Sequence, residues 1–518
     1  MDALDLARWQ FGITTVYHFI FVPLTIGLSL LVAIMHTRAV YAKDALRKDA
    51  WTRMTKFFGS MLIVNFGIGI ATGIVQEFQF GLNWSEYSRY VGDVFGAPLA
   101  LEGLAAFFLE SVFLGLWIFG WGKLPEKIHL LTIWAVAVGS ALSAYFIIAA
   151  NSFMQHPVGA TLNPETGRAE LDPSQGSILS VLTNVTTMAA FPHVVSGAWL
   201  VAGAFLTGVA SWHMVRHHNR ARELGLETEE GQEQHLAARD LYRPVVRFGV
   251  LAMVISAVVL VITGDMQAKL MFEQQPMKMA SAEALCETQT DVPFSILTVG
   301  GPDAFSEDCD GVTHLIEIPY VTGILATNDP HAELQGVEDL NAQYKEQFGE
   351  TAVNIHGEEV AADYRPNLFV TYWSFRLMMG LAAFSGILAV WALWATRGKG
   401  EAARTTGSRA FAWFAVLAIP MPFLANSAGW VFTEIGRQPW VVHPNPLDPT
   451  VRLMTMQGVS SHPGWMVLTS LAAFTLVYGV LAVLWFQMMR KAALKGVPLA
   501  RRDPETDELD TPTLSFDY

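Results

Sequence analysis

The sequence predicts an all-α integral membrane protein built from nine membrane-spanning helices. Of its 518 residues, 52% are hydrophobic and only 15% are charged, and its mean hydropathy is +0.34. Soluble globular chains carry more charge. The apolar residues also gather in nine runs of the roughly 20 residues that a helix needs to cross a bilayer. These runs lie near residues 13–35, 57–80, 95–122, 128–150, 188–212, 245–264, 368–396, 410–433 and 464–488.

The first run is expected to be retained as a helix. It is too long for the core of a signal peptide, no basic stretch precedes it, and no convincing cleavage site follows it. The composition as a whole excludes the nucleic-acid-binding, collagen-like, disordered and small disulfide-rich classes.

The basic residues predict the orientation of the helices. With the amino terminus outside, the inner loops and the carboxyl-terminal tail hold 23 of the 33 Lys and Arg residues, and the outer segments hold nine. Lys and Arg accumulate on the cytoplasmic side of membrane proteins. We therefore expect an outside amino terminus and a cytoplasmic carboxyl terminus.

The net charge of −14 comes from one segment. Residues 265–365 carry 19 Asp and Glu against four Lys and Arg, so the rest of the chain is nearly neutral. A loop of this length without a clear helix or strand pattern is uncommon and is usually functional or disordered. The expected organisation is helices 1–6 in residues 1–264, a long extracytoplasmic loop between helices 6 and 7 in residues 265–367, helices 7–9 in residues 368–490, and a cytoplasmic tail in residues 491–518.

Both cysteines of the chain, Cys286 and Cys309, lie in this loop. In an oxidising exterior they are positioned to form a disulfide that closes a 24-residue loop. Such a bond contributes about 3 kcal/mol in the entropic account of disulfide stability. Two free thiols are the alternative.

Ionisable side chains inside the spans are candidates for function, because each costs about 3 kcal/mol at mid-membrane. His18, His193, Arg376 and Glu434, together with Met378, fall at similar depth toward the outer ends of runs one, five, seven and eight. Taken singly, a histidine on an apolar helix is more often a hydrogen-bonded packing residue, and Arg376 could be an arginine that reaches the interface. As a group they favour haem, since His and Met are axial iron ligands and helix bundles hold such cofactors between facing helices.

The third run carries two acids, Glu102 and Glu110, eight residues apart. In an α-helix this separation is about 12 Å of rise and about 80° of rotation, so both carboxylates can face one interior path. Two acids in a span indicate a proton relay, which Ser143 of the fourth run could extend; a pair of structural, hydrogen-bonding acids is the alternative. Three histidines within residues 213–218 stand among arginines and are expected to form a solvated basic face.

Short motifs follow one another along nearly the whole chain. In order they are Arg8-Trp-Gln-Phe, Tyr17-His-Phe-Ile-Phe-Val-Pro-Leu-Thr, the helix with Glu102 and Glu110, Ala150-Asn-Ser-Phe-Met-Gln-His-Pro-Val-Gly, Gly264-Asp-Met-Gln, Pro276-Met-Lys-Met-Ala with Glu283, Ser374-Phe-Arg-Leu-Met, and Gly436-Arg-Gln-Pro-Trp. Some are weak alone, but in this order they are highly specific. The chain resembles subunit I of the cytochrome bd-type quinol oxidases, whose nine-helix topology with an outside amino terminus agrees with the one predicted above.

The resemblance implies three haems near the outer face. By motif position, His193 and Met378 would ligate a low-spin haem b, with Arg376 beside it. His18 and Glu434 would each hold one of two high-spin centres, a haem b and the haem d that reduces dioxygen; which residue holds which haem stays open. Three further residues match positions near those haems, namely Arg8, Trp430 and Arg437.

The resemblance also implies a terminal quinol oxidase of the bacterial plasma membrane. Lys278 and Glu283 would bind the quinol hydroxyls in the long loop, and Glu102, Glu110 and Ser143 would carry protons from the cytoplasm, so that a proton motive force arises without a pump. The family works with a second membrane subunit, and small single-helix accessory subunits are further candidate partners beside quinol, dioxygen and the lipid bilayer. The sequence does not distinguish ubiquinol from menaquinol.

Two other classes explain parts of the pattern. A membrane cytochrome that relays electrons through a haem b would need His193 and Met378, but neither the high-spin sites nor the acids. A secondary transporter would explain nine spans with buried carboxylates, yet transporters often show inverted repeats and broken helices, which this sequence does not display.

Overall fold

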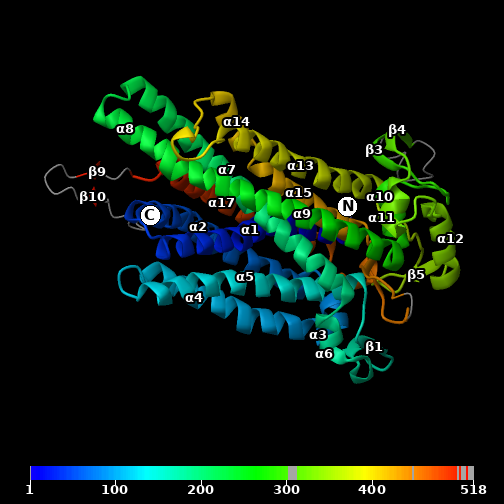
Figure 1. Cartoon of the computed structure of the whole chain (residues 1–518). Coiled ribbons are helices and arrows are strands. Elements are labelled where there is room, and N and C mark those ends of the chain that lie inside the picture. Colours follow the sequence, from blue (N-terminus) through cyan, green and yellow to red (C-terminus); the bar gives the residue numbers. More distant parts are fainter. Residues whose placement is uncertain (1, 301–311, 446–447, 499–500, 503–508, 511–518) are drawn as a thin grey trace.

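The long helices run side by side along one axis (Figure 1). The computed structural model describes residues 2–300, 312–445, 448–498, 501–502 and 509–510. Within these residues, nine helical segments are long and apolar enough to span a membrane, and each coincides with one of the predicted runs. The predicted fold class, an all-α membrane protein, is confirmed.

Six of the described spans are single helices. They are α1 (Ala3–Val40), α2 (Ala45–Leu82), α5 (Glu126–Gln155), α7 (Val185–Leu224), α13 (Leu368–Ala395) and α17 (Gly464–Lys495).

The other three spans are composite. The third joins α3 (Ser85–Leu101), the π-helical turn η1 (Glu102–Phe107) and α4 (Phe108–Phe119); the sixth joins α8 (Glu229–Leu236), the π-helical turn η3 (Ala237–Tyr242) and α9 (Arg243–Gln274); the eighth joins α14 (Arg409–Leu417) and α15 (Pro420–Ile435).

Local sequence sets where several helices begin and end. The Asp2 carboxylate caps α1 by accepting a hydrogen bond from the Asp5 N–H at 2.8 Å. Helix α7 ends at Leu224 and is followed by Gly225, whose φ of 83° an L side chain rarely adopts. The eighth span is interrupted where Pro420 lacks the N–H that would continue the helix from α14 into α15.

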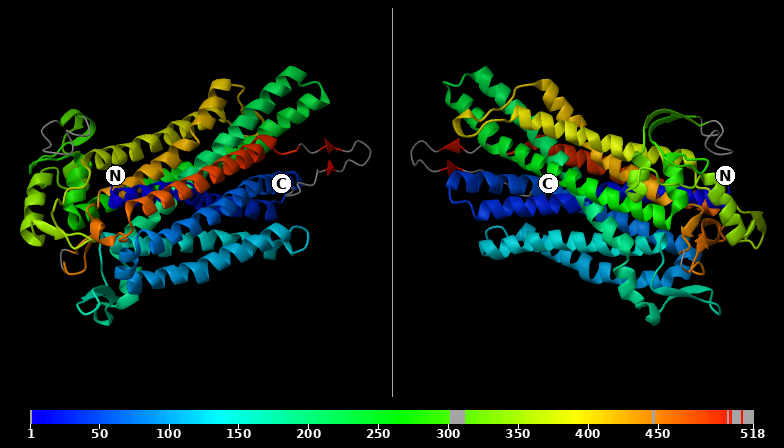
Figure 2. Two further views of the ribbon diagram at one scale, coloured as in Figure 1. Left: turned by 180° about the vertical axis from the view of Figure 1, so that it is seen from behind. Right: turned by 45° about the vertical axis from the view of Figure 1, so that its right-hand side comes forward.

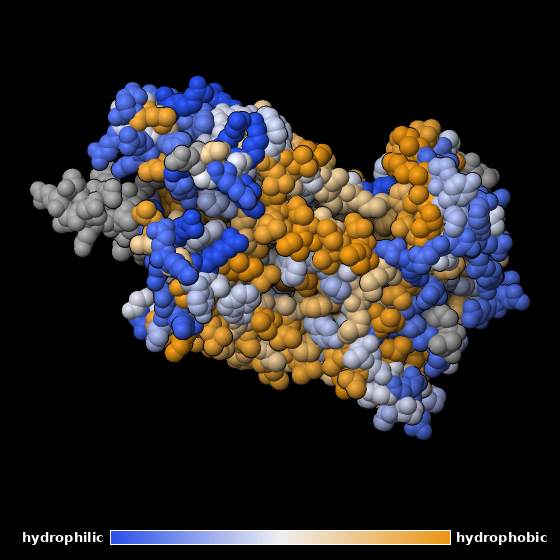
Figure 3. Space-filling view, viewed as in Figure 1, coloured by the Kyte–Doolittle hydropathy of each residue, from blue (hydrophilic) through white to orange (hydrophobic). Residues whose placement is uncertain are grey.

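Helix α7 lies at the centre of the bundle, and α17 lies at its surface. In the most apolar stretch of each, 89% of α7 residues are buried but only 11% of α17 residues. Close packing at the centre depends on small residues, because a Cβ at Gly27 of α1 would lie 2.2 Å from the Ala198 carbonyl oxygen of α7. Figure 3 shows the corresponding apolar surface as a broad band between two polar ends, as expected for a protein surrounded by lipid.

The two ends of the bundle differ. The start of α1 lies at the end that carries α10, α11 and α12, whereas the end of α17 lies at the opposite end (Figures 1 and 2). We call the first the loop end, because the segment between α9 and α13 covers it. An odd number of described spans requires the start of the first and the end of the last to be on opposite sides, and α1 and α17 agree with this.

The described part of the loop between α9 and α13 is folded, although its sequence showed no clear pattern. It forms its own small core, in which Met277 and Leu340 pack with Tyr372 of α13. Helix α9 also continues to Gln274, ten residues beyond the apolar run that ends near 264, because the polar turns beyond that run remain helical. The loop contains α10 (Pro276–Glu283), β3 (Phe294–Val299), β4 (Thr313–Ile318), α11 (Val321–Thr327), α12 (Val337–Phe348), β5 (Thr351–Val353) and β6 (Glu359–Ala361).

Short elements complete the connections. The described strands form antiparallel pairs only, β1 with β2, β3 with β4, β5 with β6, β7 with β8 and β9 with β10. The remaining elements are β1 (Ala160–Asn163), β2 (Arg168–Leu171), η2 (Pro173–Gln175), α6 (Ser177–Leu182), η4 (Gly400–Ala402), β7 (Trp440–Val442), β8 (Leu453–Met454), α16 (Thr455–Gly458), β9 (Arg501–Arg502) and β10 (Leu509–Asp510).

Candidate functional site

His18 lies on α1 and contacts the neighbouring helix α2. Its Nδ1 is 2.9 Å from Oγ1 of Thr72, and the Thr72 hydroxyl donates its own proton to the Gly69 carbonyl at 2.9 Å. Because this hydroxyl has no second proton to give, His18 Nδ1 is the donor and the lone pair of the ring is on Nε2. A histidine whose Nδ1–H is held by a hydrogen bond, with Nε2 open, is arranged to bind a metal.

His193 on α7 repeats this arrangement. Its Nδ1 is 3.0 Å from Oγ1 of Thr263 on α9, and the Thr263 hydroxyl donates to the Val259 carbonyl at 2.7 Å. The same argument therefore assigns the lone pair of His193 to Nε2. Two histidines, on two different helix pairs, are held in the form that can bind iron.

A glycine follows each of these threonines and lets the helix backbone pack closely against the imidazole. A Cβ at Gly73 would lie 3.2 Å from Cε1 of His18, and a Cβ at Gly264 would lie 3.6 Å from Cε1 of His193. The sequence analysis missed both threonines. Thr-Gly also occurs at residues 207–208, so only helix packing shows which copies face a histidine.

Met378 and Arg376 lie on α13, which packs against α9 and α15. Gly429 of α15 faces Met378 closely, since a Cβ at Gly429 would lie 2.7 Å from the methionine sulfur. Arg376 instead reaches the long loop, where its Nη2 donates to Glu283 at 2.5 Å. The structure thus places Met378 against α15 and connects Arg376 to the loop.

Glu434 lies near the end of α15, with both carboxylate oxygens in hydrogen bonds. Oε1 accepts from Asn151 Nδ2 of α5 at 2.9 Å, and Oε2 accepts from Arg437 Nη2 at 2.6 Å. Trp430, one turn earlier, stacks on Phe19 with ring centroids 5.2 Å apart. This stacking brings α15 against the part of α1 that carries His18.

Glu102 and Glu110 both face α5. Ser143 Oγ donates to Glu102 Oε1 at 2.7 Å, and Gly139 packs against Glu110, where a Cβ would lie 2.8 Å from Cγ. The π-helical turn η1 begins at Glu102 and contains about one extra residue, so the eight positions to Glu110 take about two turns. The rotation of about 80° expected for a regular helix is therefore reduced, which brings the two carboxylates onto one side.

Lys278 lies on α10 and is 6% exposed. Its Nζ donates to Oε1 of Gln155, the last residue of α5, at 2.6 Å. Burial, together with the positive charge of Arg437, lowers the pKa of Lys278 to about 7, while Glu434 opposes this shift. The amine is thus close to the point at which it exchanges a proton.

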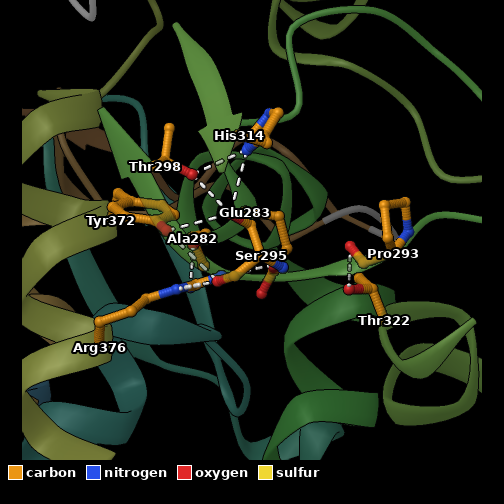
Figure 4. A network of polar contacts seen from close by, with 9 residues as sticks. All are labelled: Ala282, Glu283, Pro293, Ser295, Thr298, His314, Thr322, Tyr372 and Arg376. Carbon is orange, nitrogen blue, oxygen red and sulfur yellow. Dashed lines mark hydrogen bonds and ion pairs between the residues drawn. The ribbon is translucent and has the colours of Figure 1, made fainter. Parts of the chain in front are cut away.

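Glu283 is five positions further along α10 and is 4% exposed. Its Oε2 accepts from Arg376 Nη2 at 2.5 Å and from the Ser295 N–H at 3.3 Å (Figure 4). Burial raises the pKa of Glu283, and the Arg376 guanidinium opposes that shift. Lys278 and Glu283 therefore lie on one short helix but in different surroundings, which spacing alone did not reveal.

Some sequence candidates stand apart from these groups. Arg8 is exposed near the start of α1 and has no side-chain hydrogen bond or ion pair to another described residue. The predicted disulfide joins Cys286 to Cys309, which lies outside the described residues, so it stays a prediction.

The expectation of a solvated histidine face is wrong for His213. This residue is 2% exposed and stacks on Tyr242, with ring centroids 5.1 Å apart.

Known proteins match the chain over nearly its whole length. The sequence profile of the family described as cytochrome bd terminal oxidase subunit I matches residues 6–497. The chain belongs to this family. It is 38% identical to the cytochrome bd ubiquinol oxidase subunit 1 of Bacillus subtilis (strain 168), over 96% of this chain and 94% of that protein.

Two further comparisons agree with this assignment to the cytochrome bd family. The chain is 35% identical to the cytochrome bd-II ubiquinol oxidase subunit 1 of Escherichia coli (strain K12), over 85% of this chain and 88% of that protein. The solved structure of the bd oxidase from Geobacillus thermodenitrificans superposes with a TM-score of 0.76 at 24% identity, covering 96% of this chain and 99% of that one. The chain is a multi-pass membrane subunit of a bd-type terminal oxidase, and this assignment excludes a secondary transporter.

The residues of this structure fit the haem groups that the family implies. Among the described residues, Tyr17 OH, Trp430 Nε1 and Arg437 Nη1 are buried polar atoms without a hydrogen-bond partner, and such groups are rare in folded proteins. Each lies beside a candidate ligand, and each could donate to the carboxylates of a porphyrin. With the two open Nε2 atoms of His18 and His193 and the thioether of Met378, the donor set suits haem iron.

Proposed function

We propose that this chain oxidises quinol at the outer face of the bacterial plasma membrane and reduces dioxygen to water with protons taken from the cytoplasm. The observation that carries the proposal is the pair of histidines, His18 and His193, each held by a threonine with Nε2 open. An electron relay with a single haem b would need only His193. A second histidine in the same form favours an oxidase.

The ligands are assigned by position. His193 and Met378 would hold a low-spin haem b, while His18 and Glu434 would each hold a high-spin haem, one of type b and one of type d. When bound, these haems supply electron transfer and the reduction of dioxygen. Arg437 balances the charge of Glu434 at 2.6 Å, and three residues are proposed to lie near haem carboxylates: Arg8, Trp430 and Arg376.

Quinol is proposed to bind between the loop and the bundle, at Lys278 and Glu283. Both side chains are buried, and each keeps an atom that can meet a quinol hydroxyl. The described contacts of Glu283 all go to Oε2, so Oε1 can accept a hydrogen bond. The amine of Lys278, with a pKa of about 7, can donate a hydrogen bond or exchange a proton.

Protons for the reduction of dioxygen are proposed to move along Glu102, Ser143 and Glu110. The Ser143 hydroxyl already joins Glu102 to α5, and the π-helical turn η1 aligns the two carboxylates. Because these protons would come from the cytoplasm while quinol protons leave outside, charge would separate across the membrane without a pump. This orientation follows the bias of Lys and Arg, which places the amino terminus and the loop end outside.

A second membrane subunit is the proposed partner. The apolar stretches of α17 and of the third span are 11% and 17% buried, so lipid or another subunit must cover them. Relatives that carry the name subunit 1 support a multi-subunit enzyme. Small single-helix accessory subunits would fit the same apolar band.

Absorption spectroscopy of the purified oxidase tests the proposal. His193→Ala should remove the low-spin haem b signal from the reduced-minus-oxidised spectrum and leave the high-spin signals, because only the low-spin centre would lose a ligand. An unchanged low-spin signal would refute that role. A wild-type spectrum without haem would refute the oxidase.

Adjacent methionines give a matched control. Met378→Leu should also remove the low-spin signal, whereas Met379→Leu, at an exposed neighbouring position, should leave it. Equal spectra for the two leucine variants would count against Met378 as a ligand.

A further inference from the structure

A chain of hydroxyl groups runs from the buried Arg376–Glu283 pair toward the surface of the loop (Figure 4). Two of its members, Ser295 and Thr298, lie on β3, and both are buried. Their hydroxyl oxygens are 2.5 Å apart. Hydroxyls can both donate and accept, so a row of them can pass a proton.

An irregular strand register brings these two hydroxyls together. In a regular strand, residues three positions apart point to opposite faces. Here Ser295 pairs with Glu317 and Thr298 pairs with His314, with register shifts on both sides of Leu297. A β-bulge re-aims side chains in this way, and Ser295 and Thr298 consequently share one face.

His314 on β4 ends the chain at the surface. It lies directly opposite Thr298, and its Nδ1 is 2.8 Å from Thr298 Oγ1 and 3.0 Å from Ser295 Oγ. His314, like every residue of β4, is exposed, so its ring can reach solvent. One ring thus contacts both the buried hydroxyls and the outer medium.

Tyr372 forms the inner end of the chain. Its hydroxyl is 3.1 Å from Ser295 Oγ, and the Arg376 guanidinium carbon lies 4.2 Å from the centre of its ring. Arg376 in turn holds Glu283 at 2.5 Å. Ser295, which carries the first hydroxyl after Tyr372, also donates its N–H to Glu283 Oε2 at 3.3 Å. The hydroxyls therefore begin beside the carboxylate at which quinol is proposed to bind.

We propose that His314 is the proton exit of quinol oxidation, receiving protons through Tyr372, Ser295 and Thr298 and releasing them outside. The inference rests on the proposed function. Oxidation of one quinol to quinone gives two electrons, which go to the haem centres, and two protons. Each proton passes along the hydroxyls to His314 Nδ1. The imidazolium then rotates so that Nδ1 meets water, releases that proton, and returns as the neutral Nε2–H ring that can accept the next.

The charges around His314 suit this role. Burial and the positive charge of Arg376 lower the pKa of His314, and Glu317 on the same strand raises it. The neutral ring, which is the form that can accept a proton, therefore predominates at neutral pH. Quinol oxidation should then slow as the pH falls and the imidazole becomes protonated.

The test compares His314→Gln with the wild-type oxidase in proteoliposomes. Glutamine can keep the hydrogen bond to Thr298 but cannot take up a proton. We expect quinol oxidation at pH 7.5 to slow at least about tenfold, since positioned acid–base groups contribute about 10²–10⁴-fold, and we expect its pH dependence to flatten. Proton release, followed with an impermeant pH dye outside, should slow equally. Imidazole added outside should restore both rates.

A loop histidine outside the hydroxyl chain provides the control. His331 pairs with Asp291 at 2.5 Å and its side chain is 71% exposed, so His331→Gln should behave as wild type. Ser295→Ala interrupts the chain internally and keeps the backbone contacts to Arg376 and Glu283. It should slow oxidation in a way that imidazole does not restore.

Three results would overturn the inference. They are a wild-type rate and pH profile in His314→Gln, a slow His314→Gln that imidazole fails to restore, and a wild-type rate in Ser295→Ala. If the wild-type oxidase itself does not oxidise quinol, the proposed function fails, and the proton exit fails with it. Failure of the proton exit alone is recognised differently, because the variants are then compared with a wild type that is active.

Discussion

Lys278 and Glu283 lie on the same two-turn helix and are almost equally buried, at 6% and 4% exposed. They differ in whether a counter-ion lies beside the charged group. Glu283 has a buried counter-ion, Arg376, at 2.5 Å. Lys278 has no ion pair with any described residue; it donates to the neutral amide of Gln155 and is close to Arg437, whose charge repels it.

The difference shows that burial alone does not decide what a polar group does. A buried charge with a good partner fixes the structure around it, because removing the partner leaves an uncompensated charge. A buried amine without a counter-ion has a lowered pKa and can exchange a proton near neutral pH. Glu283 thus anchors the loop to α13, and Lys278 is the more reactive of the two groups.

Removing Arg376 should have the largest effect on stability. Arg376→Met leaves Glu283 buried without its counter-ion, and such a change costs about 3–5 kcal/mol. Thermal melting of the purified oxidase, followed by tryptophan fluorescence, should show a clear fall in melting temperature. Arg365→Met is the matched control, since Arg365 pairs in the same loop with Glu338 and Asp363, whose side chains are 42% and 54% exposed, and should cost about 1 kcal/mol or less. Equal falls in melting temperature for the two variants would contradict the role of Arg376 in stabilising the loop.

Glu283→Gln should have an intermediate effect. Arg376 keeps its hydrogen bonds to the Ala282 and Ser295 carbonyls, so the loss is that of one charge-assisted hydrogen bond, about 1.5–3 kcal/mol. The melting temperature should fall less than in Arg376→Met. A larger fall than in Arg376→Met would show that Glu283 contributes more to the stability of the loop than Arg376 does.

Lys278→Met should change stability least, by about 1 kcal/mol or less in either direction. Methionine fills a similar volume without the cost of a buried amine, and Gln155 keeps its bond from Gln275 at 2.9 Å. Quinol oxidation should nevertheless fall, while oxidation of an artificial donor that bypasses the loop should persist. A melting temperature as low as that of Glu283→Gln would show that Lys278 also carries structure.

Much of the fold could be predicted from the sequence because a bilayer imposes simple rules. Apolar runs of about 20 residues located all nine described spans. The cost of a polar group in hydrocarbon drew attention to His18, His193 and Glu110 before any contact was known. The fold of the loop could not be predicted, because its short elements are held by contacts between distant residues, such as Tyr372 of α13 with Ser295 of β3.

The sequence by itself determined that this is a nine-span membrane protein of the cytochrome bd type, with its net negative charge concentrated in one loop and its candidate ligands near one end. Only the tertiary structure decided how those side chains are used. Thr72 and Thr263 set which imidazole nitrogen is open, η1 aligned Glu102 with Glu110, and a bulge in β3 aimed Ser295 and Thr298 at His314. The reason is physical: hydropathy is a property of each segment, whereas a tautomer or a proton path depends on which atoms two segments bring within about 3 Å of each other.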